Sequence, residues 1–245
     1  MRIENGTVLI TGANRGIGLA LVQEALRRGA AQVYAGVRAP WSHPDPRVVP
    51  LILDVTDRQQ IGRAAGRVSE LDVLVNTAGI AVYDDLTDRD VIDRHLAVNL
   101  YGIHDVTTAF RPHLIRSKGA VVNNLSLNSL APLPVIPAYG ISKAAAFSLT
   151  QSLRAQLSAH RVSVHAILTG PTDTDMNRGF DIPKATTESV ARAIFDGAER
   201  GDEEIFPDPW SESLAADWLG GAVKTLERQL AEGAGEPDPN VTVTG

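Results

Sequence analysis

The stretch Thr7–Gly18, TVLITGANRGIG, decides the fold class of this chain. Its opening part, Thr7–Thr11, is rich in β-branched and apolar side chains and predicts a buried strand. A turn with three glycines follows, and Gly18–Gly29 then shows apolar residues at helical spacing, with its last glycine closing the helix. A strand, a glycine-rich turn and a helix in this order indicate the start of a βαβ unit.

The same alternation continues along the chain and predicts a parallel sheet that is buried on both faces. Further strands are predicted at Gln32–Val37, Val48–Val55, Leu71–Gly79, Gly119–Ser126, Arg161–Leu168 and Glu203–Pro207. Further helices are predicted at Asp57–Val68, Thr87–Leu96, Leu100–Ile115 (closing at Pro112 or just after it), Ala138–His160, Thr187–Arg200 and Trp210–Ala231. With right-handed crossovers this is an α/β fold, a doubly wound parallel seven-stranded sheet with helices on both faces (Rossmann fold), which binds ligands at the carboxyl ends of its strands.

Composition and length narrow the class of protein. The chain has 245 residues, of which 44% are apolar, which suits a single domain over residues 1–232. The Gly/Pro-rich segment 233–245 is expected to be a flexible tail or to pack on a partner subunit. With 23 basic and 29 acidic residues the net charge is −6, so neither nucleic acid nor an anionic membrane is expected as a partner.

Several other classes of site are not expected. The chain has no cysteine, which excludes disulfides and thiolate nucleophiles, and its six histidines lack the spacing of metal ligands. Its amino-terminal stretch shows no signal-peptide pattern, and no apolar run reaches about 18 residues. These features predict a cytoplasmic protein without a metal site.

Gly12, Gly16 and Gly18 can serve three purposes in the turn after the first strand. Gly12 allows a tight turn, Gly16 lets the backbone approach a pyrophosphate, and Gly18 lets helix and strand pack closely. The other interpretation is an ordinary βα turn, because this glycine spacing differs from the commoner GxGxxG. We expect a dinucleotide here, held along the whole turn including Asn14, Arg15 and Ile17.

The end of the second predicted strand indicates which dinucleotide binds. NAD sites usually place a carboxylate there for the ribose hydroxyl, whereas NADP sites place an arginine for the 2′-phosphate. Here Val37 is followed by Arg38, with no acid at either position, and Arg15 lies in the glycine turn. Two guanidinium groups near one ribose favour the additional phosphate, and the alternative is that both are solvated surface side chains. The sequence therefore predicts NADP (NADPH).

Tyr139 and Lys143 lie four residues apart on a predicted helix and therefore share a face. An ammonium group near a phenol stabilises the phenolate, which should lower the pKa of Tyr139 from about 10 toward a range that is useful for acid–base catalysis. The other interpretation is an exposed pair on an amphipathic helix. These two residues alone leave both interpretations open.

Taken together, these motifs resemble the short-chain dehydrogenase/reductase family, in its form with one Rossmann domain. The resemblance covers roughly residues 5–207. It rests on Thr11-Gly12-x-x-x-Gly16-x-Gly18, Asn76-x-Ala78-Gly79, a serine before Tyr139, Tyr139-x-x-x-Lys143, and Asn99 in AVNLYG. There are two departures, since Thr77 replaces the usual second asparagine, and Thr169 replaces a proline and predicts a less rigid loop.

The resemblance implies a role for each matching residue. Tyr139 would be the general acid in reduction or the base in oxidation, and Lys143 would tune it and hold the nicotinamide ribose. Ser126 would hydrogen-bond the substrate oxygen, and Asn99 would kink its helix and hold a water that links Lys143 to solvent. The cofactor would be held by Asp54 and Val55 at the adenine, by Asn76, Ala78 and Gly79 beside the adenosine ribose, and by Gly170, Thr172 and Thr174 at the nicotinamide and pyrophosphate.

Three serines compete for the catalytic role beside Tyr139. Ser126 has the family's spacing from Tyr139 and ends the fifth predicted strand. Ser129 lies well into the following loop, and Ser142 lies inside the Tyr/Lys helix, turned away from that strand. Ser126 is therefore the expected member of the group.

The chemistry expected from this set is hydride transfer between NADPH and a ketone or aldehyde, or the corresponding secondary alcohol. A dehalogenase or lyase on the same fold would be expected to lack Lys143 and to have a degraded glycine turn. A catalytically silent dinucleotide sensor or scaffold would be expected to lack Tyr139 or Lys143. Both residues are present, which favours an oxidoreductase.

Apolar residues are expected around the substrate, which favours a carbonyl compound of moderate size without a fixed charge. They are Leu127, Leu133, Val135, Ile136, Met176, Phe180 and Ile182. Members of the family usually pair through two long helices, which correspond here to Tyr101–Ile115 and Ala138–His160. The resemblance therefore implies a homodimer or homotetramer.

Overall fold

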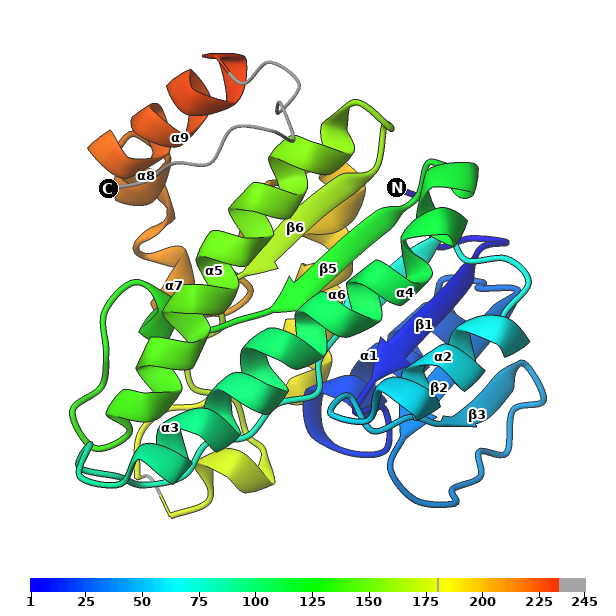
Figure 1. Ribbon diagram of the computed structural model, residues 1–245, viewed down its shortest axis with the longest axis horizontal. Coiled ribbons are helices and arrows are strands. Elements are labelled where there is room, and N and C mark those ends of the chain that lie inside the picture. Colours follow the sequence, from blue (N-terminus) through cyan, green and yellow to red (C-terminus); the bar gives the residue numbers. More distant parts are fainter. Residues whose placement is uncertain (180, 234–245) are drawn as a thin grey trace.

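The structure is a computed structural model that describes residues 1–179 and 181–233. In this part of the chain seven parallel strands form one sheet in the order β3-β2-β1-β4-β5-β6-β7 (Figure 1). The strands are β1 (Thr7–Thr11), β2 (Gln32–Val37), β3 (Val48–Ile52), β4 (Val73–Asn76), β5 (Ala120–Asn124), β6 (Ser163–Ile167) and β7 (Glu204–Ile205). The order reverses between β1 and β4, which confirms the predicted doubly wound Rossmann fold.

Helices cover both faces of the sheet because its strands are apolar on both sides. In Figure 1 α2, α4 and α5 cover the face turned to the viewer, and α1 and α6 pack together behind it. The main helices are α1 (Gly16–Arg27), α2 (Arg58–Arg67), α3 (Arg89–Leu96), α4 (Gly102–Ser117), α5 (Pro137–Ser158) and α6 (Thr187–Arg200). Two separate buried clusters, one per face, make up most of the core.

The prediction that a helix closes near Pro112 is wrong, because α4 continues to Ser117. Phe110 and Leu114, on either side of the proline, are both fully buried and hold both halves of the helix in the core. The Ser117 hydroxyl also donates to the carbonyl oxygen of Leu71 at 2.7 Å. The helix ends at Lys118, whose left-handed backbone makes the cap.

The prediction of a single helix from Trp210 to Ala231 is also wrong. The segment forms three shorter helices, α7 (Pro209–Glu212), α8 (Ala215–Leu219) and α9 (Ala222–Gly233), with a break at Gly220 and Gly221. Since α9 includes Gly233, the helical part of the chain passes the predicted domain boundary by one residue. Residues 234–245, the rest of the predicted tail, lie outside the described residues.

Most predicted strands are longer than the observed ones at their carboxyl ends. The ladder of β4 stops at Asn76, for example, because the next two backbone N–H groups, of Thr77 and Ala78, donate instead to the Thr11 hydroxyl at 3.0 and 3.1 Å. The chain therefore leaves the sheet in loops along one edge, where the predicted site residues lie. Among the helices of the described residues, none has the length and apolarity to cross a membrane.

Candidate active site

In the glycine turn at the end of β1, segments of backbone approach each other closely. Gly12 has a left-handed φ of +66°, a conformation that side chains rarely adopt. A Cβ at Gly18 would lie 2.2 Å from the carbonyl oxygen of Gly12, so a larger residue would force the turn apart. Gly16 approaches Thr174, whose Cγ2 would lie 3.4 Å from an added Cβ. The turn thus forms an open cradle next to the loop that follows β6.

The start of α1 fits a phosphate group. Arg15 is its N-cap residue, and no side chain caps the helix, so the first N–H groups keep the unsatisfied donors of a helix start. These donors and the helix dipole favour an anion. The side chain of Arg15 is exposed and lies 3.9 Å from Asp175, and Arg38 is exposed just beyond β2. Asn14 and Ile17 complete the turn, which therefore fits the diphosphate and extra phosphate of NADP.

Ser126, Tyr139 and Lys143 are brought together at the carboxyl edge of the sheet. Ser126 follows β5, and α5 begins with Pro137 at a favourable first position and carries the other two residues. The hydroxyl groups of Ser126 and Tyr139 are hydrogen-bonded to each other. Lys143 Nζ lies 5.6 Å from the centroid of the Tyr139 ring. All three side chains are buried, as a protected catalytic group requires.

The pKa values of this group differ from those expected. Burial raises the pKa of Tyr139 to about 12, against the opposite effect of its hydrogen bond with Ser126. Burial also lowers the pKa of Lys143 to about 8. The ammonium group donates to the carbonyl oxygen of Asn124 at 2.8 Å. The expected lowering of the Tyr139 pKa is therefore wrong, because loss of water around the phenol outweighs the hydrogen bond with Ser126 that lowers the pKa.

Asn99 lies in a π-helical turn, Ala97–Tyr101, between α3 and α4. Its Oδ1 accepts from the N–H of Ile80 and its Nδ2 donates to the carbonyl oxygen of Ile80, both at 2.9 Å. Nδ2 also donates to the Ser142 hydroxyl at 2.9 Å, which in turn donates to the carbonyl oxygen of Tyr139 at 2.7 Å. The expected irregularity of this helix is present as the π turn, and it aims Asn99 at the catalytic helix.

Three of the residues predicted around the adenosine have side chains with partners inside the protein. Asp54 accepts hydrogen bonds from the N–H and hydroxyl of Thr56, so its carboxylate closes a local turn. Val55 is buried against Gly102. Asn76 also points inward, and its Nδ2 donates to Asn123 Oδ1 at 2.9 Å. The structure thus turns the side chain of Asn76 into the core and leaves only its backbone at the site.

Ala78 and Gly79 remain at the site edge. Ala78 lies against the glycine turn, since its Cα would be 3.1 Å from a Cβ on Gly12. A Cβ on Gly79 would lie 3.3 Å from Asn99 Oδ1 and 3.8 Å from Lys143 Nζ. This segment therefore connects the glycine turn with the catalytic group.

The loop after β6 closes the other side of the site. The Thr169 hydroxyl donates to Asn124 Oδ1 at 2.9 Å, which ties the loop down where the family has proline. The N–H of Gly170 donates to Asp208 Oδ2 at 2.7 Å. Thr172 is buried and forms a bridge with Ala185. The loop is fixed at both ends, so the expectation of a less rigid loop finds no support in these contacts.

Sequence reasoning missed three buried residues that support the site, namely Ser142, His95 and Asp208. His95 Nε2 accepts from the N–H of Val82 at 3.1 Å, and its Nδ1 faces the carbonyl oxygen of Val91 at 2.7 Å. Its ring stands edge-on to that of Tyr139, with centroids 6.4 Å apart. The bonds that join His95 to Val82 and Asp208 to Gly170 span 13 and 38 positions of sequence, and no local pattern indicates them. Ser142 alone had a signal, because a serine three residues after Tyr139 can reach that residue's carbonyl oxygen.

The apolar residues predicted around the substrate differ in their exposure. Leu127 and Ile136 are half-buried, whereas Leu133, Val135, Met176 and Ile182 are exposed. Phe180, predicted with them, lies outside the described residues. Val82 and Tyr83, in the loop before α3, add further exposed apolar surface.

A cavity of about 470 Å³ lies beside Gly16, between α1, residues 173–179 and the start of α6, and so on the glycine-turn side rather than beside Tyr139. Within residues 1–179 and 181–233, no three acidic, histidine or cysteine side chains gather in a group that could hold a metal ion.

The chain is also similar to known proteins in sequence and in structure. Residues 6–184 match the family model described as short chain dehydrogenase. Sorbitol dehydrogenase of Cereibacter sphaeroides is 31% identical over 205 residues, which cover 78% of this chain and 80% of that protein. A crystal structure of a short chain dehydrogenase from Burkholderia cenocepacia J2315, in complex with NADP, has 35% identity and a TM-score of 0.86 over 94% of this chain and 99% of that one. ElxO with NADP bound matches in fold, with 24% identity and a TM-score of 0.76 over 85% of this chain and 99% of that one.

Proposed function

This chain belongs to the short-chain dehydrogenase/reductase family, and on that basis we propose that it is an NADPH-dependent carbonyl reductase, interconverting a ketone or aldehyde with its alcohol. The observation that carries the proposal is the buried group of Ser126, Tyr139 and Lys143 next to an open glycine cradle. NADP is supported by the 35% identical relative that was crystallised with it, and by two exposed arginines at the expected edge.

The catalytic residues divide the work of reduction. NADPH, when bound, supplies a hydride to the carbonyl carbon. Tyr139, with a pKa of about 12, stays protonated at neutral pH and gives its proton to the carbonyl oxygen as negative charge develops there. The Ser126 hydroxyl, already hydrogen-bonded to Tyr139, stabilises the same oxygen. Lys143 and Asn99 hold the helix and neighbouring backbone that aim the phenol.

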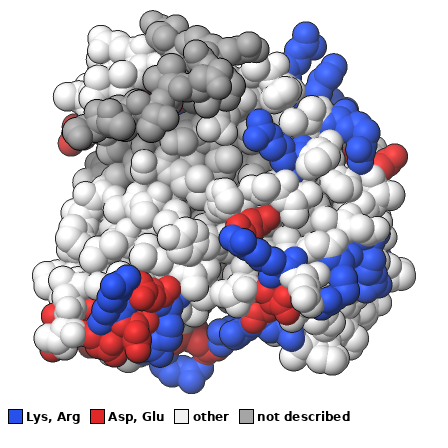
Figure 2. All heavy atoms as spheres, in the orientation of Figure 1, with Lys and Arg blue, Asp and Glu red and all other residues white. Residues whose placement is uncertain are grey.

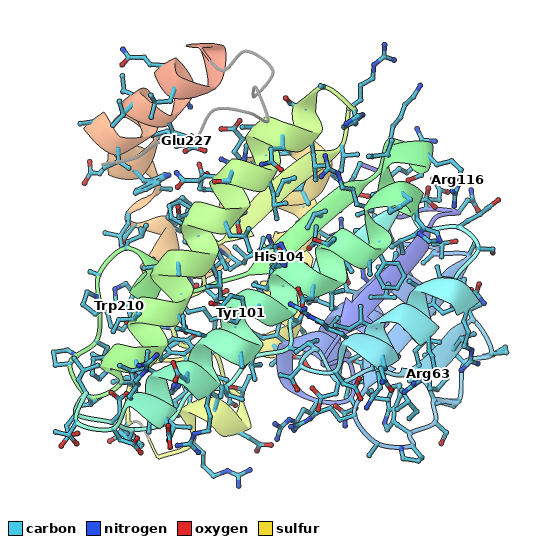
Figure 3. The ribbon with its side chains drawn as sticks, in the orientation of Figure 1. Arg63, Tyr101, His104, Arg116, Trp210 and Glu227 are labelled. Carbon is cyan, nitrogen blue, oxygen red and sulfur yellow. The ribbon has the colours of Figure 1, made fainter. Side chains whose placement is uncertain are left out.

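The choice of cofactor is tested at Arg38. Arg38→Asp should raise the KM for NADPH by at least about tenfold, because it places a carboxylate where the 2′-phosphate would bind. Steady-state kinetics with NADPH and NADH measure this directly. Arg63→Asp is the matched control, since Arg63 is also exposed but lies on α2 (Figure 3). An unmodified protein that prefers NADH would show that our interpretation of Arg15 and Arg38 is wrong.

We base the substrate class on the apolar residues that are expected around Tyr139. We expect NADPH oxidation with neutral ketones or aldehydes of moderate size, and a kcat/KM at least about tenfold lower for analogues that carry a carboxylate, because burying that charge against apolar side chains is costly. A panel of matched neutral and charged carbonyl compounds measures this ratio. A preference for the charged analogues would contradict the proposal. Tight NADPH binding without turnover of any compound would favour a silent sensor instead.

We also propose that two copies pair through α4 and α5. His104 on α4 and Tyr101 on the π turn before it lie on the outer side of the structure in Figure 3, and Tyr101 and Ile141 are exposed apolar side chains. The part of the surface over α5 that is not covered by grey atoms in Figure 2 is largely free of charged side chains. A partly aromatic surface with few charged side chains over α5 suits a helix from a second copy and supports a homodimer or homotetramer.

A further inference from the structure

Asp208, directly after β7, is a buried carboxylate that receives three hydrogen bonds. Its Oδ1 accepts from the N–H of Ser211 at 3.0 Å, and its Oδ2 accepts from the Ser211 hydroxyl at 2.7 Å. These two bonds cap the short helix α7. Oδ2 also accepts from the N–H of Gly170 at 2.7 Å. With 4% of its surface exposed, Asp208 is held firmly and has little contact with water.

The bond to Gly170 is not part of the helix cap. It joins the end of β7 to the loop after β6, across 38 positions of sequence. A Cβ on Gly170 would lie only 2.5 Å from Asp208 Oδ1. Gly170 does not have a left-handed φ, so the need for glycine here comes from the close approach of the carboxylate rather than from the backbone conformation. The position of the Asp208 carboxylate therefore requires a residue without a Cβ at position 170.

The loop that Asp208 holds leads directly to the catalytic group. Next to Gly170, Thr169 donates through its hydroxyl to Asn124 Oδ1, and its carbonyl oxygen accepts from the N–H of Leu127 at 3.0 Å. The carbonyl oxygen of Asn124 also receives Lys143 Nζ. The loop is thus anchored to the catalytic strand on one side and to Asp208 on the other.

We infer that Asp208 is a positioning residue, which holds Gly170 and the following residues in the conformation that binds the nicotinamide half of the cofactor. This inference rests on the proposed function, because it assigns the loop to one half of NADPH. A role in capping α7 alone would require only the two bonds to Ser211. The third bond, with the close contact at Gly170, is what fixes the loop relative to the sheet.

The test compares two ligands on the full-length chain. NADPH carries both halves of the cofactor, whereas 2′,5′-ADP carries only the adenosine half with its phosphates. In Asp208→Asn one side-chain oxygen becomes an NH2 group, which cannot accept and therefore meets either the N–H of Gly170 or the N–H of Ser211 without a hydrogen bond. We expect the Kd for NADPH, measured by fluorescence titration, to rise about tenfold, which corresponds to about 1.4 kcal/mol. The Kd for 2′,5′-ADP, measured by calorimetry, should stay within about twofold of its original value.

Ser211→Ala is the matched control, because it removes a capping hydroxyl and leaves the Gly170 contact in place. It should lower the melting temperature and leave both Kd values unchanged. If Asp208→Asn weakens the binding of both ligands equally, or of neither, the positioning role is overturned. NADPH binding by the unmodified protein would in that case still support the proposed function. An unmodified protein that binds neither ligand would overturn the proposed function and this inference together.

Gly170→Ala examines the same contact from the loop side, in case Asp208→Asn does not fold. The added methyl group meets the carboxylate at 2.5 Å and should displace the loop. A selective rise in the Kd for NADPH supports the inference, and an unchanged Kd for NADPH overturns it.

Discussion

Tyr139→Phe should lower kcat for carbonyl reduction by about 10²–10⁴-fold and leave the Kd for NADPH within about twofold. The substitution removes only the phenolic oxygen, which is the proposed proton donor and the partner of Ser126. The phenylalanine ring fills the same buried space and keeps its edge contact with His95. Turnover is measured from NADPH oxidation at saturating substrate, and binding from NADPH fluorescence.

Tyr101→Phe provides a matched control for this prediction. Tyr101 is 55% exposed on the π turn before α4, so loss of its hydroxyl should leave kcat unchanged. Retention of full kcat by Tyr139→Phe would remove Tyr139 from the mechanism. A loss of NADPH binding in proportion to kcat would show that the residue serves the cofactor instead of the proton transfer.

Lys143→Met should abolish most activity and stabilise the fold at neutral pH. Burial lowers the pKa of Lys143 to about 8 from an ordinary value of 10.5, so keeping its charge at pH 7 costs stability. Methionine has a similar length and no charge. We expect the free energy of unfolding at pH 7 to rise by about 1–2 kcal/mol, which allows for the lost hydrogen bond to Asn124. The fall in kcat should be about 10²–10⁴-fold.

The pH dependence of stability distinguishes the cost of the buried Lys143 charge from the other effects of Lys143→Met. Between pH 8 and 10.5 the unfolded wild-type chain binds more protons at Lys143 than the folded chain does, so wild-type stability rises with pH in this window. The advantage of Lys143→Met should therefore shrink from pH 8 to 10.5. Tyr139 is present in both proteins, and its raised pKa affects them alike. Denaturant unfolding at pH 7, 9 and 10 measures the difference.

Lys118→Met is the control for this series, because Lys118 is exposed at the end of α4. It should show a small difference in stability that does not change with pH. A constant difference between wild type and Lys143→Met across pH 7 to 10 would contradict the lowered pKa of Lys143. Full activity of that variant would contradict its place in the catalytic group.

Local patterns in the sequence predicted those parts of the fold that local physics determines. The strands Thr7–Thr11 and Gln32–Val37 and the helix Thr187–Arg200 were predicted with the bounds that the structure has. Asp57 likewise caps α2, as an aspartate before a helical segment should. Pro112 shows the limit of this reasoning, since tertiary packing of its neighbours outweighs the local cost of proline in a helix.

The parts of the site that the sequence could not predict depend on distant contacts. The spacing from Ser126 to Tyr139 and Lys143 indicated a shared site through resemblance, and the fold brings the three together. The bonds from His95 to Val82 and from Asp208 to Gly170 reach other loops, and no periodicity signals them. The raised pKa of Tyr139 has the same origin, because it results from burial of the phenol by the whole fold.

The most direct test of the proposed reduction follows the transferred hydrogen. The protein would be given a neutral ketone and NADPH that carries deuterium at the transferable C4 position, in ordinary water, and the alcohol product analysed by mass spectrometry. We expect one deuterium on the carbinol carbon of the product from the wild-type protein, because the hydride comes from the cofactor and the hydroxyl proton from Tyr139. An alcohol product without deuterium, or no alcohol from any neutral carbonyl although NADPH binds, would contradict the proposed function.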